Sequence, residues 1–166
     1  MNRVTIRIIT SNSMIAALYV VLTLITYPIS FLGVQFRFAE LLVLLCFFRK
    51  DYIIGLSVGT AIVNFTSPIG VLDVAFGTLA TIVACLGIMF SKQLAIACLF
   101  PIISNAFIVG FELWKFLGEP FWISTGLVAI GETTVMVVAY ILYMVLRRKN
   151  SFFNLVNAKQ NLDFKW

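Results

Sequence analysis

The sequence has 166 residues with a net charge of +5, and 61% of the residues are hydrophobic. The mean hydropathy of +1.05 excludes a soluble globular domain and indicates an integral membrane protein with roughly five to seven spans of about 20 residues each. The sequence has no histidine and no G-x-x-x-x-G-K-[ST] loop, which excludes histidine metal sites, Ser-His-Asp triads and nucleotide hydrolysis by a phosphate loop.

Apolar runs separated by short polar breaks predict an all-α bundle of six transmembrane helices. The first run follows a basic start, as in a signal peptide, but no small-x-small cleavage site follows it, so we expect a retained helix. The expected helices cover about residues 13–29, 37–48, 52–67, 71–90, 94–113 and 121–146. Residues 1–149 then form one transmembrane domain, and residues 150–166 form a cytoplasmic tail that we expect on the membrane surface.

The basic residues predict how the bundle is oriented. With six helices both termini lie on one side, and that side collects ten of the twelve Lys and Arg residues: Arg3, Arg7, Arg49, Lys50, Lys92, Arg147, Arg148, Lys149, Lys159 and Lys165. The positive-inside rule therefore predicts cytoplasmic termini, and it explains the net charge without a nucleic-acid partner.

Polar side chains concentrate in the outer half of the predicted bundle. Glu132 lies eleven residues into the last helix, about 16 Å from the outer end, where a carboxylate is costly and cannot reach water. The other members of the set are Gln35, Arg37, Glu40, Asn64, Asp73, Asn105 and Glu112. Each also has a structural interpretation: an ion pair of Arg37 with Glu40, a helix cap at Asp73, or a buried hydrogen bond at Glu132.

An outer cavity lined by carboxylates, amides and aromatic rings suits several ligands. A planar heterocycle with a guanine-like edge would donate two hydrogen bonds to one carboxylate and accept one from an amide. An amine or a metal cation would also fit, and a row of acids could conduct protons. The residues alone leave these alternatives open.

Several stretches resemble the QueT family of substrate-binding S components of energy-coupling factor (ECF) transporters. The similarity extends from about Ala16 to Arg148. Its specific parts are a Q-F-R-x-x-E-x-L motif from Gln35 and an N-x-x-S-P-x-G-x-x-D-x-x-F-G motif from Asn64, with further stretches at 16–23, 105–112 and 131–132.

The resemblance implies a micronutrient-binding subunit in the bacterial cytoplasmic membrane. Its substrate would be a queuosine precursor, a 7-deazaguanine base carrying a 7-cyano or 7-aminomethyl group, or queuine. It would associate with a transmembrane coupling subunit and two ATPase subunits, so ATP is used by the partners and this chain needs no cofactor. Glu132 and Asn105 would hold the base, Gln35 and Arg37 would form the lid side, and the walls would be Glu40, Asn64, Asp73 and Glu112.

The resemblance also implies a partner contact on helix one. S components tend to place small residues there in an A-x-x-x-A pattern. This chain has Ala16 and Ala17, followed by Val20 and Val21, and so departs from the strict pattern.

Three other classes compete with this interpretation. A self-sufficient or proton-coupled carrier would move a heterocycle or cation without any ATPase, and inverted repeats, its usual mark, are missing. An enzyme would need a nucleophile with a base, or a metal site, and no such set is visible. A structural subunit would have little reason to hold several carboxylates in one half of the membrane.

Overall fold

The computed structural model describes residues 3–30 and 36–162, and this part of the chain is helical without a strand. The elements are α1 (Arg3–Ile25), α2 (Tyr27–Ser30), the 3₁₀ helix η1 (Phe38–Phe47), α3 (Tyr52–Asn64), α4 (Val71–Phe90), α5 (Leu94–Leu117), α6 (Phe121–Leu146) and α7 (Asn150–Leu155).

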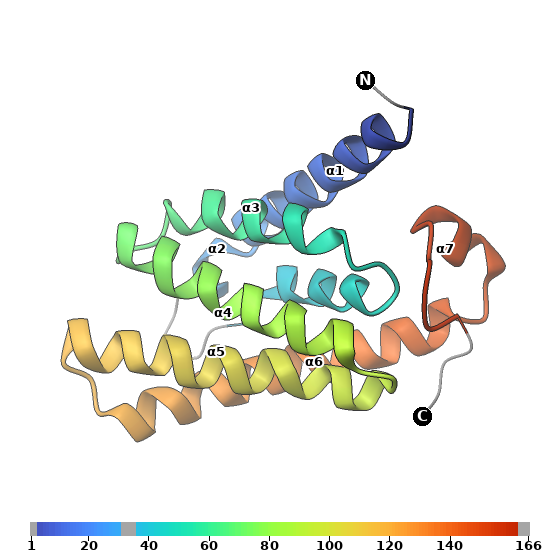
Figure 1. Ribbon diagram of the computed structural model, residues 1–166. Helices are drawn as coiled ribbons and strands as arrows, with labels where there is room; N and C mark the ends of the chain where they lie inside the picture. Colours follow the sequence, from blue (N-terminus) through green and yellow to red (C-terminus); the bar gives the residue numbers. More distant parts are fainter. Residues whose placement is uncertain (1–2, 31–35, 163–166) are drawn as a thin grey trace.

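Four helices, α1, α4, α5 and α6, are long and apolar enough to cross a membrane, and η1 and α3 are shorter apolar helices. The chain is thus an all-helical multi-pass membrane protein. The six-span count and the cytoplasmic position of both termini remain predictions. The start of α1 and helix α7 do lie toward the same end of the bundle (Figure 1), and residues of both line one groove of about 590 Å³.

Helix η1 forms the centre of the bundle. It appears as the cyan segment between the α3–α4 layer and the α5–α6 layer (Figure 1), and it contacts α1, α3, α4, α5 and α6. Seven of its ten residues are buried, among them Glu40, Val43 and Phe47. The sequence predicts an ordinary helix over residues 37–48, but the structure has the tighter 3₁₀ form, which rises about 2.0 Å per residue. Ten residues therefore span about 20 Å.

Helix α1 starts earlier than its predicted first residue, near 13. Ser11 and Asn12 precede that predicted start, but both side chains donate to carbonyls of the preceding turn. Ser11 Oγ donates to the Arg7 carbonyl at 2.8 Å, and Asn12 Nδ2 donates to the Ile8 carbonyl at 3.0 Å. Helix α1 ends at Ile25, before the end predicted near residue 29. Pro28 in the short helix α2 explains this, because a proline has no N–H to continue the hydrogen bonds of α1.

Two other helix ends differ from the prediction. Helix α3 ends at Asn64, and residues 65–70 make a tight turn into α4. Helix α5 continues four residues beyond 113 to Leu117, where Gly118 at φ 71° provides a left-handed C-cap. The prediction ended this helix at residue 113 and left residues 114–120 as a loop, but the aromatic residues there also suit the last turn of a helix at the membrane interface.

Helices α1 and α3 approach closely at two glycines. A side chain on Gly55 would overlap the Asn12 carbonyl oxygen, and one on Gly59 would press on Ala16. Asn12 Oδ1 accepts the Gly55 N–H at 2.8 Å, so the close approach also adds an interhelical hydrogen bond. Small residues are what such membrane-helix contacts require.

Candidate functional site

Four carboxylic acids from four different helices are buried near one another. Their side chains come from η1, α4, α5 and α6, and the exposed fractions are 0% for Glu40, 5% for Asp73, 0% for Glu112 and 4% for Glu132. Burial of a charge is costly unless the group is paired. The cluster must therefore contain compensating partners, or it must receive them from a ligand.

Arg37 is the cation shared by these acids. It is buried at the N-terminal end of η1 and interacts electrostatically with Glu40, Asp73 and Glu132, and with Glu112. These interactions link η1 to α4, α5 and α6. One guanidinium thus faces four carboxylic acids, which leaves acceptor capacity for a ligand with donor groups.

Glu132 is held by the predicted neighbour Asn105. Asn105 Nδ2 donates to Glu132 Oε1 at 3.0 Å between α5 and α6, and Asn105 also interacts with Glu40. The second oxygen, Glu132 Oε2, is buried without a hydrogen-bond partner among the described residues. Asn105 therefore orients Glu132 and leaves one of its oxygens available.

Glu40 is oriented by a residue that sequence reasoning missed. Tyr19 of α1 is fully buried, and its hydroxyl donates to Glu40 Oε1 at 2.5 Å. Glu40 Oε2 has no partner within the described part of the chain. A buried tyrosine usually needs a partner for its hydroxyl, and this was the available signal in the otherwise apolar run of helix one.

Glu112 faces Asp73 across the α4–α5 interface. The two acidic groups interact electrostatically, and neither oxygen of Glu112 has a well-formed hydrogen bond to another described residue. Thr125 of α6 is also buried, and its hydroxyl has no partner in the part of the chain that the structure describes. This side of the cluster has more unused acceptors than the Glu132 side.

Asn64 has a structural contact. Its Nδ2 donates to the backbone carbonyl of Asp73 at 2.9 Å, which fastens the end of α3 to the start of α4. Its amide also occupies the space over Gly77, where a Cβ atom would overlap it. Asn64 Oδ1 remains unsatisfied within the described residues, so one polar atom is still free to meet a ligand.

The predicted set is thus largely brought together. Arg37, Glu40, Asp73, Asn105, Glu112 and Glu132 form the cluster, with Asn64 at its edge. Gln35 lies outside the described residues. On helix one, Ala16 is buried against Gly59, whereas Ala17 is exposed and lines the groove beside the tail.

Aromatic rings gather where α4 begins, α5 ends and α6 begins. Phe76 lies with its ring centroid 6.1 Å from that of Phe111, and Phe111 lies 5.7 Å from Trp114. Trp114 in turn contacts Phe121 at 6.1 Å. These rings suit the interface with lipid headgroups.

Comparison with known proteins identifies the family to which the chain belongs. The family model of the QueT transporter matches residues 9–148. The protein described as "Queuosine precursor transporter QueT" from Lactococcus lactis subsp. cremoris (strain MG1363) is 37% identical over 141 residues, which cover 75% of this chain and 82% of that protein. No solved structure matches the chain.

The chain belongs to the QueT transporter family. The family is described as one of transporters rather than enzymes, which agrees with an apolar helical chain. In this QueT protein the buried cluster offers positioned acceptors from Glu40, Glu112 and Glu132, and donors from Arg37. Such a set can recognise a small polar molecule by hydrogen bonding.

Proposed function

We propose that the chain is the substrate-binding S component of an ECF transporter and that it takes up a 7-deazaguanine precursor of queuosine. The observation that supports this most is that Glu40, Glu112 and Glu132 have buried carboxylic oxygens without a hydrogen-bond partner among residues 3–30 and 36–162. Leaving a buried acceptor unsatisfied costs about 1–3 kcal/mol, so a ligand rich in N–H donors would recover that energy.

A 7-deazaguanine matches these groups chemically. Its N1–H and exocyclic amino group are adjacent donors that fit one carboxylate, for which Glu132, oriented by Asn105, is the best candidate. Its carbonyl oxygen accepts, and Arg37 is a suitable donor. Its pyrrole N–H is a third donor, for which Glu40 Oε2 is available. No chemical step on the substrate is required.

The route of transport follows from the proposed class. The base enters from the outer side and is held in the cluster, and the subunit reorients when its coupling partner is driven by ATP hydrolysis in two separate ATPase subunits. Of the two predicted contact residues on helix one, Ala17 is the one that is exposed toward a coupling subunit, because Ala16 is buried inside the bundle. The alternative is a self-sufficient carrier, which would need none of these partners.

Uptake of radiolabelled 7-aminomethyl-7-deazaguanine by proteoliposomes distinguishes the ECF subunit from the self-sufficient carrier. We expect no uptake with this chain alone, and uptake dependent on internal ATP when the coupling and ATPase subunits are included. Uptake by the chain alone, at the same rate with or without ATP, would establish the self-sufficient carrier.

Among the possible bases we propose the 7-aminomethyl form. Its protonated amine needs a carboxylate beyond those that hold the ring, and Glu112 beside Asp73 provides one. Glu112→Gln should weaken binding of the aminomethyl base by roughly 10–100-fold, the usual range for a hydrogen bond to a charged group. Binding of the uncharged 7-cyano base should change less than about threefold. Calorimetric titration with both bases measures this, and an equal loss for both would contradict the assignment of Glu112.

The Tyr19 contact gives a second expectation for the site. Tyr19→Phe removes only the hydroxyl that orients Glu40, so the affinity for the base should fall by about fivefold to tenfold, in line with one lost hydrogen bond. Tyr140→Phe is the matched control, because it removes a hydroxyl from the C-terminal half of α6, away from Glu40, and should leave the affinity unchanged. Unchanged affinity in Tyr19→Phe would show that Glu40 does not depend on this contact.

A further inference from the structure

Helix η1 needs support from outside itself. It is a 3₁₀ helix of ten residues, and 3₁₀ runs longer than three or four residues are uncommon because their hydrogen bonds have poorer geometry. Its outer end follows Arg37 and carries Glu40, both in the candidate site. Its inner end reaches Phe47 and Phe48, about 20 Å away at the 3₁₀ rise.

The C-terminal tail folds back onto that inner end. The last carbonyls of a helix have no partner inside it. Here tail groups donate to them: the Lys159 and Gln160 N–H groups to Phe48 at 2.9 and 3.2 Å, Gln160 Nε2 to Phe47 and Cys46 at 3.0 and 3.2 Å, and Asn161 Nδ2 to Phe47 at 2.7 Å. The tail therefore caps η1.

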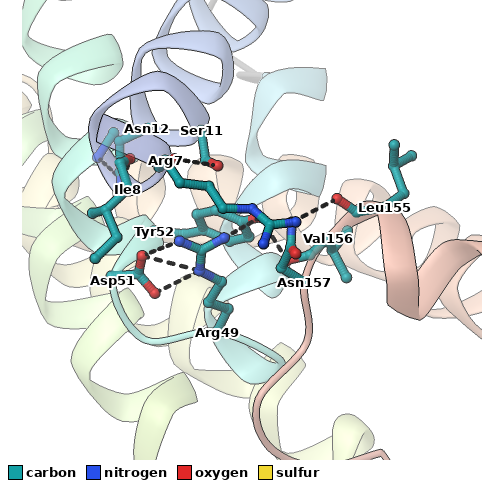
Figure 2. A network of polar contacts seen from close by, with 11 residues as sticks. Arg7, Ile8, Ser11, Asn12, Arg49, Asp51, Tyr52, Leu155, Val156 and Asn157 are labelled. Atoms are coloured by element: carbon teal, nitrogen blue, oxygen red, sulfur yellow. Dashed lines mark hydrogen bonds and ion pairs between the residues drawn. The ribbon is translucent and has the colours of Figure 1, made fainter. Parts of the chain in front are cut away.

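Other contacts hold the tail in this position. Phe152 of α7 is buried with its ring centroid 5.4 Å from that of Phe48 and 5.8 Å from that of Tyr143. Figure 2 shows the polar network between the tail and Tyr52, where the Tyr52 hydroxyl donates to the Val156 carbonyl at 2.6 Å. In the same network Arg49 pairs with Asp51 at 2.5 Å.

The backbone conformation also directs the tail toward η1. Asn157 and Asn161 have positive φ angles of 47° and 53°, a conformation that asparagine adopts more readily than most residues. Asn157 turns the chain immediately after α7, and Asn161 places its own side chain on Phe47. The fold-back is therefore encoded by specific tail residues.

We propose that Gln160 and Asn161 are positioning residues for the substrate site, acting through η1. Their amides fix the inner end of η1, and the helix transmits that position to Glu40 and Arg37. A shift of η1 by one residue would move Glu40 by about 2 Å and rotate it by about 120°. This inference rests on the proposed function, because the effect is measured on substrate binding.

The test replaces both amides by apolar side chains of similar size. The double variant Gln160→Met with Asn161→Leu keeps the bulk of the tail and removes the side-chain donors to η1, whereas the N–H groups of Lys159 and Gln160 can still donate to Phe48. We expect the affinity for 7-aminomethyl-7-deazaguanine, measured by calorimetry, to fall about tenfold. Asn154→Leu, an amide of the same tail with an exposed side chain, is the control and should leave affinity unchanged. Unchanged affinity in the double variant would overturn the inference.

A double-mutant cycle separates positioning from general loosening of the bundle. Combined with Glu40→Gln, the tail variant should lower the affinity clearly less than tenfold, because one of the two groups that it positions is already altered. Combined with Glu132→Gln on α6, the tail variant should still lower the affinity for the base about tenfold. Equal losses in both backgrounds would show a general structural effect and would overturn the inference.

Hydrogen exchange gives an outcome that does not depend on any ligand. In the tail variant we expect the amides of η1 to exchange at least fivefold faster, with the buried middle of α5 unchanged. If the unmodified chain binds no deazaguanine, the proposed function fails by itself, and this exchange result still decides whether the tail fixes η1. Unchanged exchange in η1 would overturn the inference in either case.

Discussion

Glu132→Gln is expected to weaken binding of a 7-deazaguanine base by roughly 100-fold or more. The carboxyl group is buried in α6, is oriented by Asn105 at 3.0 Å and has one oxygen without a partner among the described residues. A glutamine replaces one acceptor oxygen by a donor, which would face a donor of the base. Two hydrogen bonds to a charged group at about 1.5–3 kcal/mol each account for the magnitude. Calorimetry on the detergent-purified chain measures it.

The control for this variant is Glu119→Gln. Glu119 is exposed in the connection between α5 and α6, and its carboxylate accepts from Ser124 at 2.9 Å. Affinity should be unchanged there, because the side chain lies outside the buried cluster. Wild-type affinity in Glu132→Gln, with correct folding, would remove Glu132 from the site.

Gly55→Ala is expected to have the largest effect on stability. A Cβ atom at this position would overlap the backbone carbonyl oxygen of Asn12, and backbone cannot move aside as a flexible side chain can. The substitution forces α1 away from α3 and breaks the hydrogen bond from Gly55 N–H to Asn12 Oδ1. Overpacking of this kind costs about 1–3 kcal/mol, and the lost hydrogen bond adds about 1 kcal/mol. Thermal unfolding in detergent should occur at a clearly lower temperature.

Gly126→Ala is the matched control for that change. Gly126 is also helical, in α6, and has open space where its Cβ would be. Alanine favours a helix over glycine by about 1 kcal/mol, so this variant should be as stable as the parent or slightly more stable. A Gly55→Ala variant as stable as Gly126→Ala would contradict the close packing of α1 on α3.

Helix periodicity and depth made much of the buried polar cluster predictable from sequence. A carboxylate eleven residues into an apolar helix has few explanations, so Glu132 could be identified without structural information. Asn105 and Glu112 are seven residues apart and therefore share a face of α5. The tight turn with Pro68 and Gly70 predicts that Asn64 and Asp73 lie at the same depth on facing helices, and in the structure Asn64 Nδ2 donates to the backbone carbonyl of Asp73 at 2.9 Å.

Contacts between distant residues were not predictable in the same way. Tyr19 in an apolar helix is compatible with plain packing, and its partner Glu40 lies 21 residues away. The 3₁₀ form of η1 has no local sequence mark, because its apolar residues would equally suit an α-helix. The polar composition of the tail predicts only a surface segment. Its amide side chains donate to carbonyls of η1 that lie more than 100 residues earlier in the sequence, and such a contact has no local signal.

The central claim, that the buried cluster binds a 7-deazaguanine without help from other subunits, is tested most directly by calorimetric titration of the purified chain. The titrants are 7-aminomethyl-7-deazaguanine, its 7-cyano analogue and guanine. We predict saturable binding of the aminomethyl base to the chain alone, with one site per chain and a lower affinity for guanine. The claim would be contradicted if none of the three bases gave a heat of binding with protein whose cooperative thermal unfolding shows that it is folded.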